Sequence, residues 1–267
     1  GFVVTRAEAA ALGLGVIPGL ERRIREYRNG RDLTDRPRDV LVIDTIGLTA
    51  DDLRRRFPAV FQWLLERVKP ERDLVRRKSI RENWWLHAWS RNTFRPALDS
   101  IPRFIATGQV AKHRVFQFLD ASVLPDDKLI AIATSDAFHH GVLSAAVHVQ
   151  WSLVSGGRLG IGNDPVYSKS TCFEAFPFPS DDTGLTPALA DRIRTLAEQL
   201  DAHRKARQAA HETVTLTGVY NVLDKLRREQ LLTDADKALH EQGLVSVLRT
   251  LHNELDAAVL EAYGWSD

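Results

Sequence analysis

Methionine is absent from this 267-residue sequence, and cysteine occurs once, at Cys172. A single cysteine excludes an internal disulfide and a cysteine-based zinc cluster. No run of apolar residues approaches the ~18 that a membrane-spanning helix needs, and no charged segment leads into an apolar one as in a signal peptide. These absences predict a cytoplasmic protein. Because no initiator methionine is present, we expect the chain to be a fragment of a longer protein.

The usual signs of a metal site are also missing. The nine histidines show no ligand-like grouping, and the adjacent His139 and His140 would point about 100° apart in a helix. Glu66, Glu71 and Asp73 do not form a nuclease site, because the spaced Asp…Glu-x-Lys arrangement of such sites is absent. We therefore expect no bound metal and no metal-dependent catalysis.

Charge is distributed unevenly along the chain, although the net charge is only +1. Residues 1–68 carry a net charge of +2, residues 69–118 a net charge of +7, and residues 119–267 a net charge of −8. A basic segment between a nearly neutral start and an acidic end indicates a localised anionic partner.

Hydrophobic patterns predict an α+β fold, with strands and helices mixed at first and helices alone at the end. The apolar run 40–43 predicts a strand. Thr49 and Asp52 have capping-box spacing before a helical stretch to residue 68, in which Pro58 should kink the helix or restart it. Further strands are predicted at 103–108, 113–120 and 128–134, and helices at 138–157, 188–211, 216–230 and 237–265.

One short motif invites a catalytic interpretation. Asp164-Pro165-Val166-Tyr167 differs by one residue from the Asp-Pro-Pro-Tyr of enzymes that methylate amino groups on DNA bases, where the aromatic ring stacks on the flipped base. Such enzymes bind the methyl donor at a glycine-rich turn on a different strand. Here the candidate turn, 160–162, lies two residues before the motif. The spacing predicts that this chain neither catalyses methylation nor binds S-adenosylmethionine.

The residues around this motif resemble a known family. The run Gly156-Gly157-Arg158-Leu159-Gly160…Asn163-Asp164-Pro165…Phe176-Pro177-Phe178-Pro179 is similar to the end of the target-recognition domain in fused restriction–modification adenine methyltransferases, the Mme-I-like branch of the Taq-I-like class. Five other stretches agree in order: YRNGRDLTDRPRDVLVIDTIGL, RFPAVFQWLLERVKPERD, RENWW, RFIATGQVAKHRVFQFLD and ELDAAVLEAYGW. The resemblance covers nearly the whole chain.

This resemblance implies a domain organisation and a function. Residues 1–35 would be a linker or the end of a preceding methyltransferase domain, 36–182 a DNA target-recognition domain, and 183–267 a C-terminal helical hairpin or small bundle. The family's donor site and Asn-Pro-Pro-Tyr motif precede this region, so S-adenosylmethionine would be a cofactor of the parent enzyme alone. The partners would be double-stranded DNA and the N-terminal methyltransferase domain. An alternative is a scaffold that docks another protein without reading DNA.

Basic residues on or beside the predicted strands are the candidates for contact with DNA. Lysine and arginine donate to phosphates and to guanine, and asparagine can pair with adenine, although the same residues also occur on solvated strands and in turns. The predicted contacts are Arg103, Lys112, His113, Arg114, Arg158, Asn163 and Lys169. A further basic stretch, Arg76, Arg77, Lys78 and Arg81, is expected to form a rim that faces DNA. The neighbouring Trp84, Trp85 and Trp89 are expected to pack inside the protein.

Overall fold

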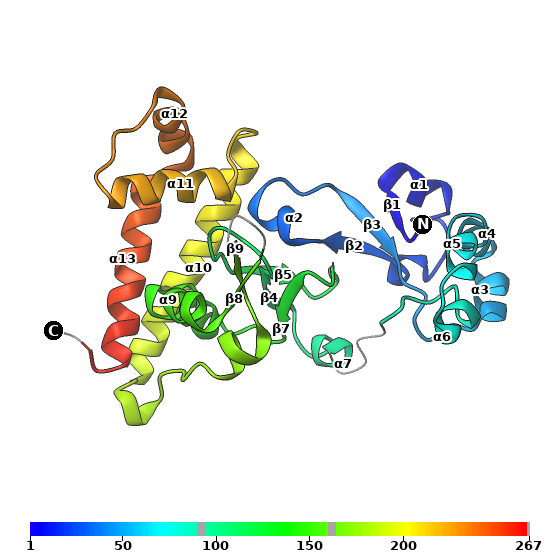
Figure 1. The fold of residues 1–267 in the computed structure, drawn as a ribbon, viewed down its shortest axis with the longest axis horizontal. Coiled ribbons are helices and arrows are strands. Elements are labelled where there is room, and N and C mark those ends of the chain that lie inside the picture. The colour runs from blue at the N-terminus through cyan, green and yellow to red at the C-terminus, as the bar shows by residue number, and fades with distance from the viewer. Residues whose placement is uncertain (90–93, 160–163, 266–267) are drawn as a thin grey trace. The chain divides into compact units, whose positions relative to one another are not determined.

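The structure of the protein is a computed structural model that describes residues 1–89, 94–159 and 164–265 (Figure 1). The chain folds into two compact units. Unit 1 comprises residues 1–28, 38–100 and 121–125, and unit 2 comprises residues 29–37, 101–120 and 126–267. Each unit therefore contains a short segment whose neighbours in sequence belong to the other unit.

Unit 1 is a small sheet with helices. Its strands are β1 (Val3–Thr5), β2 (Ile24–Arg28), β3 (Val40–Ile43) and β6 (Leu124–Pro125). They lie in the order β1-β3-β2-β6, in which β3 is antiparallel to β1 and β2, and β6 is parallel to β2. The helices are α1 (Arg6–Ala11), the 3₁₀ helix η1 (Leu20–Arg22), α3 (Ala50–Arg56), α4 (Pro58–Arg67), α5 (Lys69–Asp73), α6 (Lys78–Glu82) and α7 (Phe94–Leu98).

Several local predictions are confirmed in unit 1. The strand expected at 40–43 is β3. Thr49 caps α3 in the predicted capping box, with its hydroxyl accepting a hydrogen bond from the Asp52 backbone N–H. Pro58 starts α4 as its first residue, because proline lacks the N–H that a continuous helix would need. Leu53, Phe57, Val60, Phe61 and Leu64 then supply much of the apolar core.

Unit 2 combines two small sheets with a larger set of helices. Strands β4 (Arg103–Gly108), β5 (Gln117–Asp120) and β7 (Leu129–Ile132) form an antiparallel sheet in the order β5-β4-β7, and β8 (Gly157–Leu159) pairs with β9 (Asp164–Val166). The helices are α2 (Gly30–Thr34), α8 (Ala137–Ser144), α9 (Ala146–Ser155), the π-helix η2 (Lys169–Glu174), the 3₁₀ helix η3 (Asp181–Thr183), α10 (Pro187–Ala210), α11 (Leu216–Arg227), α12 (Asp234–Gly243) and α13 (Val245–Ala262).

Two long predicted helices are each broken in two. The stretch 138–157 divides at Ala145, whose backbone is extended, into α8 and α9. The stretch 237–265 divides at Leu244, which adopts a left-handed conformation between α12 and α13. Strand β5 is also shorter than the predicted 113–120, because residues 113–116 form the end of a loop. The α+β fold class is confirmed, with mixed strands and helices followed by a helical region.

The C-terminal helices pack directly on the β4–β5 region. Helix α10 contacts both α8 and α13 (Figure 1). The fully buried Arg204 of α10 donates to the carbonyl oxygen of Phe116 at 2.9 Å and to the hydroxyl of Tyr220 on α11. The Tyr220 hydroxyl in turn lies 2.7 Å from His252 Nε2 on α13. This polar network joins three C-terminal helices to the start of β5 within one compact unit.

The boundaries of the compact units do not coincide with the domain boundaries predicted near residues 35 and 182. Residues 29–37 pack with unit 2, and the helices after residue 183 share a unit with β4, β5 and β7. The predicted division into a target-recognition domain and a helical domain therefore stays a prediction about function.

Candidate nucleic-acid interface

Lys112 and His113 lie together in the loop between β4 and β5. The Lys112 amino group donates to Oδ1 of Asn221 at 2.6 Å, and His113 Nε2 lies 2.8 Å from the same oxygen. The His113 ring also faces Tyr220, with the ring centres 5.8 Å apart. Helix α11 therefore positions two of the predicted DNA-contacting residues through one amide side chain.

Arg114, the next residue, points into the protein and is only 8% exposed. Its guanidinium donates to the Gly108 carbonyl and, at 3.2 Å, to the Thr107 hydroxyl, and it lies 4.9 Å from the centre of the Tyr167 ring. Burial lowers the pKa of Arg114 to about 10, so it remains a cation at neutral pH. The structure thus places Arg114 among groups inside unit 2, whereas the sequence led us to predict direct contact with DNA.

Arg103 is also held within unit 2. Its guanidinium lies 3.6 Å from the centre of the Phe118 ring and donates through both amino groups to the carboxylate of Glu198 on α10. The hydrogen bonds with Glu198 raise the pKa of Arg103, and the same bonds lower the pKa of Glu198. A DNA phosphate at Arg103 would have to compete with the Glu198 carboxylate, which binds the guanidinium in bidentate geometry.

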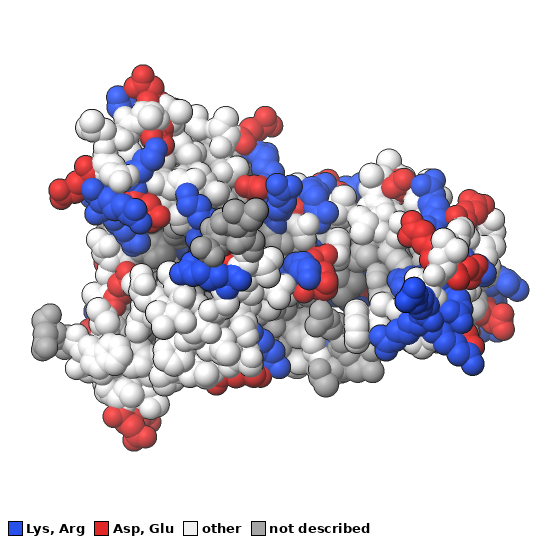
Figure 2. All heavy atoms as spheres, viewed as in Figure 1, with Lys and Arg blue, Asp and Glu red and all other residues white. Residues whose placement is uncertain are grey.

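Arg158 and Lys169 lie on or close to the β8–β9 hairpin and are exposed. Arg158 is the middle residue of β8 and pairs with Pro165 of β9 in the strand register. Lys169, in η2, has its amino group 3.0 Å from Glu174 Oε1, and its side chain is 74% exposed. Figure 2 shows lysine and arginine side chains on this face of unit 2 around the hairpin. Asn163 lies outside the described residues.

Gly156 allows this hairpin to pack closely on α9. A Cβ atom at residue 156 would lie 2.4 Å from the Val166 carbonyl oxygen and 2.5 Å from the Ser152 carbonyl oxygen. Real Cβ atoms do not approach backbone oxygens this closely. Gly156 is therefore needed for a close backbone contact within unit 2.

We therefore expect Gly156→Ala to destabilise the protein by about 1–3 kcal/mol through overpacking. Thermal unfolding followed by circular dichroism measures the effect. Gly157→Ala is the matched control, because a Cβ atom there would meet only the Val166 Cβ, at 3.9 Å. Equal melting temperatures for the two variants would contradict the packing role of Gly156.

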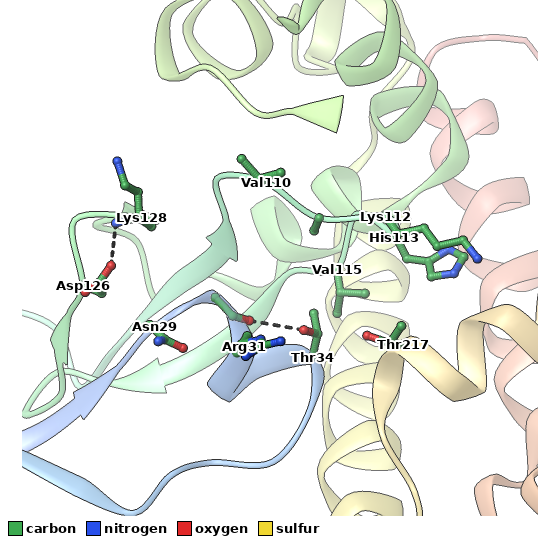
Figure 3. Close-up of a pocket in the computed structure, with 12 residues that line it drawn as sticks. Asn29, Arg31, Thr34, Val110, Lys112, His113, Val115, Asp126, Lys128 and Thr217 are labelled. Atoms are coloured by element: carbon green, nitrogen blue, oxygen red, sulfur yellow. Dashed lines mark hydrogen bonds between the residues drawn. The ribbon is translucent and has the colours of Figure 1, made fainter. Parts of the chain in front are cut away.

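A pocket of 290 Å³ opens next to Lys112 (Figure 3). It is bordered by α2, the β4–β5 loop, the turn before β7, and the first turn of α11. Lys112 and Lys128 lie on opposite sides of it, with Arg31 between them in the view. The one acidic residue of its lining is Asp126, whose Oδ1 accepts a hydrogen bond from the Lys128 backbone N–H at 2.9 Å. The excess of positive charge suits an anionic group.

Of the lining residues, only Lys112 and His113 were predicted from the sequence; Arg31, Lys128 and Thr217 are among those that were not. Arg31 lies in a segment that was interpreted as a linker, and Thr217 lies more than 80 residues after the other lining residues. No local pattern marks them, because the pocket arises when α2, in residues 29–37, packs against β4 and α11.

The Asp-Pro-Val-Tyr motif is part of the packing of unit 2. Tyr167 is fully buried, its hydroxyl lies 3.1 Å from His148 Nε2, and its backbone N–H donates to the Gln109 carbonyl at 2.7 Å. Burial raises the pKa of the Tyr167 hydroxyl above its ordinary value. A ring enclosed in this way cannot stack on a flipped base, which gives a structural reason for the non-catalytic interpretation.

Within residues 1–89, 94–159 and 164–265, no group of three or more histidine, cysteine or acidic side chains is arranged to hold a metal ion. None of the helices in this described part of the chain is both long enough and apolar enough to cross a membrane.

Comparisons with known proteins agree with the resemblance seen in the sequence. Residues 52–180 match the family described as "MmeI, target recognition domain". A solved structure of the Type IIL restriction-modification enzyme MmeI in complex with DNA has the same fold, with a TM-score of 0.67 and 17% sequence identity. The match covers 100% of this chain but only 31% of the MmeI chain. No curated protein sequence matches the chain. Residues 52–180 are therefore identified as a member of the MmeI target recognition domain family.

Proposed function

We propose that this chain is the DNA target-recognition part of an adenine-specific DNA methyltransferase of a restriction–modification system. The observation that carries the proposal is the match of residues 52–180 to the MmeI target recognition domain. The likeness to an enzyme solved in complex with DNA supports double-stranded DNA as the partner. The parent protein would take its methyl group from S-adenosylmethionine in a methyltransferase domain of the same polypeptide, and would act in the cytoplasm.

The exposed residues around the hairpin and the pocket are the proposed contacts. Arg158, Lys169, Lys112 and His113 have side chains at or near the surface of unit 2, and we keep Asn163 as a proposed contact. For Arg103 and Arg114 we propose a positioning role, because each already binds groups within the unit. Arg31 and Lys128 join the proposed set as lining residues of the pocket.

Selection from a pool of randomised duplexes tests the proposal directly. The 267-residue chain is expected to enrich a common short sequence, since target recognition requires contacts to base edges as well as to phosphates. Arg158→Gln should relax the preference at one base position, with a loss of about 1–3 kcal/mol on the enriched duplex and little on scrambled DNA. Fluorescence anisotropy on both duplexes measures this difference.

Lys169→Gln is the comparison variant, because a residue that binds phosphate weakens binding to all sequences alike. If the chain binds DNA but enriches no sequence, the docking-scaffold alternative or a purely non-specific binder becomes the better description.

A further inference from the structure

The two units differ in net charge. Unit 1 contains eighteen lysine and arginine residues and twelve acidic residues, a net charge of +6. Unit 2 contains eighteen basic and twenty-three acidic residues, a net charge of −5. Of the eleven basic residues between 69 and 118, eight belong to unit 1. A polyanion is therefore attracted mainly to unit 1, whatever its sequence.

Within unit 1, four exposed cations lie at and around α6: Arg76, Arg77, Lys78 and Arg81. Arg81 donates to the carbonyl oxygens of Val75 and Arg76, at 2.9 and 3.2 Å, and so fixes the turn that presents the other three. No acidic residue occurs between positions 74 and 81. Figure 2 shows basic side chains gathered over this part of unit 1.

An exposed tryptophan lies beside these cations. Trp89 is 67% exposed, and the Arg77 guanidinium lies 5.2 Å from the centre of its ring. The expectation that the three tryptophans pack inside is confirmed for Trp84, which is buried against Phe61, and for Trp85, whose indole N–H donates to the Leu48 carbonyl. It is wrong for Trp89. A large aromatic ring left in water beside a cation cluster is typical of a contact surface.

We propose that Arg76, Arg77, Lys78, Arg81 and Trp89, here called the α6 surface, bind the sugar–phosphate backbone of double-stranded DNA independently of sequence. The four cations match the phosphate charges, and Trp89 would cover the apolar face of a deoxyribose between them. This inference rests on the proposed function and deepens it, because it assigns most of the non-specific affinity to unit 1. Unit 2, with its net negative charge, would read bases while contributing little attraction.

The test measures the salt dependence of binding to a scrambled duplex, using the whole 267-residue chain. In the variant Arg76→Gln/Arg77→Gln/Lys78→Gln, the slope of log affinity against log salt should become shallower by about 0.9 for each lost phosphate contact. Arg81 is left in place because it holds the turn. The control is Arg54→Gln/Arg55→Gln/Arg56→Gln on α3, which removes three exposed charges of the same unit that do not belong to the α6 surface.

Trp89 is tested separately. Trp89→Ala should weaken binding to scrambled and enriched duplexes alike, by about ten-fold if the ring is a central contact, whereas Trp89→Phe should retain much of the affinity. Quenching of tryptophan fluorescence on DNA addition should decrease in Trp89→Phe compared with the wild type.

The outcomes separate this inference from the proposed function. In one outcome, the wild-type chain binds and enriches a sequence while the α6 variant and the α3 control have the same salt slope. That result would contradict DNA binding by the α6 surface and leave the proposed target recognition intact. If Trp89→Ala binds DNA as tightly as the wild type, the proposed contact of Trp89 with a deoxyribose is wrong. If the wild-type chain binds no duplex even at low salt, both proposals are overturned together.

Discussion

Asp44→Asn is expected to lower the free energy of unfolding by about 3 kcal/mol, the usual consequence of removing one partner from a buried ion pair. Asp44 follows β3 and is 3% exposed. Its Oδ2 lies 2.5 Å from Arg95 Nη1 and 3.8 Å from Arg25 Nη1, and its Oδ1 accepts a hydrogen bond from the Ile46 backbone N–H. The amide keeps the shape but removes the negative charge that Asp44 presents to two partly buried guanidinium groups.

Urea unfolding followed by tryptophan fluorescence measures this loss, since three tryptophans of the unit 1 core report on it. Asp39→Asn is the matched control, because Asp39 also pairs with an arginine, Arg6, at 2.6 Å, but both side chains are more than half exposed. Solvent and salt screen such a surface pair, so the control should unfold like the wild type. Equal losses in the two variants would show that burial does not set the strength of the Asp44 contacts.

Acid is expected to destabilise unit 2 between pH 6.5 and pH 4, because two of its histidines are buried in the neutral form. Burial lowers the pKa of His140 and of His148 to about 4. His140 Nε2 donates to the Phe116 carbonyl, and its Nδ1 has no hydrogen-bond partner among the described residues. His148 Nδ1 lies 2.9 Å from the Leu143 carbonyl, and its Nε2 accepts from the Tyr167 hydroxyl. A second proton on either ring would place a positive charge in the protein interior, which burial disfavours.

The direction of this pH dependence follows from proton linkage. A histidine whose pKa is lower in the folded state binds its proton first in the unfolded chain, so stability falls as the pH drops below the unfolded value of 6.5. The loss is complete below pH 4 and amounts to about 3 kcal/mol for each histidine. Urea midpoints measured from pH 8 to pH 4 should therefore decrease steeply.

His140→Leu removes one of the two titrating side chains. The Phe116 carbonyl keeps a hydrogen bond in this variant, because it also accepts from Arg204. The unfolding free energy of the variant should depend less on pH, by up to about 1.4 kcal/mol per pH unit between the two pKa values. The unfolding free energy of the double variant His140→Leu/His148→Gln should depend on pH even less. Parallel pH curves for the wild type and both variants would mean that these histidines do not control acid unfolding.

The domain family could be predicted from the sequence because its motifs occur in order along the chain, as the match over 52–180 confirms. Local sequence features also predicted several helix starts without any information on tertiary contacts. The capping box at Thr49 and Asp52 begins α3, and prolines 58 and 187 begin α4 and α10. Each of these signals acts within one helical turn, so neighbours in sequence carry the whole effect.

The individual site residues could not be predicted with the same success, because side-chain direction depends on residues far away in the sequence. Lys112 and Arg114 share a basic stretch and are alike in sequence terms, yet Lys112 contacts Asn221 on α11 whereas Arg114 turns inward to the Gly108 carbonyl. Trp84 and Trp89 are five residues apart, and only the first is buried.

The sequence by itself determined the α+β fold class, the starts of α3, α4 and α10, and the family, because capping, helix-breaking and ordered motifs can be recognised without tertiary contacts. Only the tertiary structure decided which cations are exposed and which unit carries them. Residues 29–37 pack with unit 2 and residues 121–125 with unit 1. The packing of residues 29–37 against β4 and α11, which depends on contacts between distant segments, builds the pocket around Arg31 and Lys128.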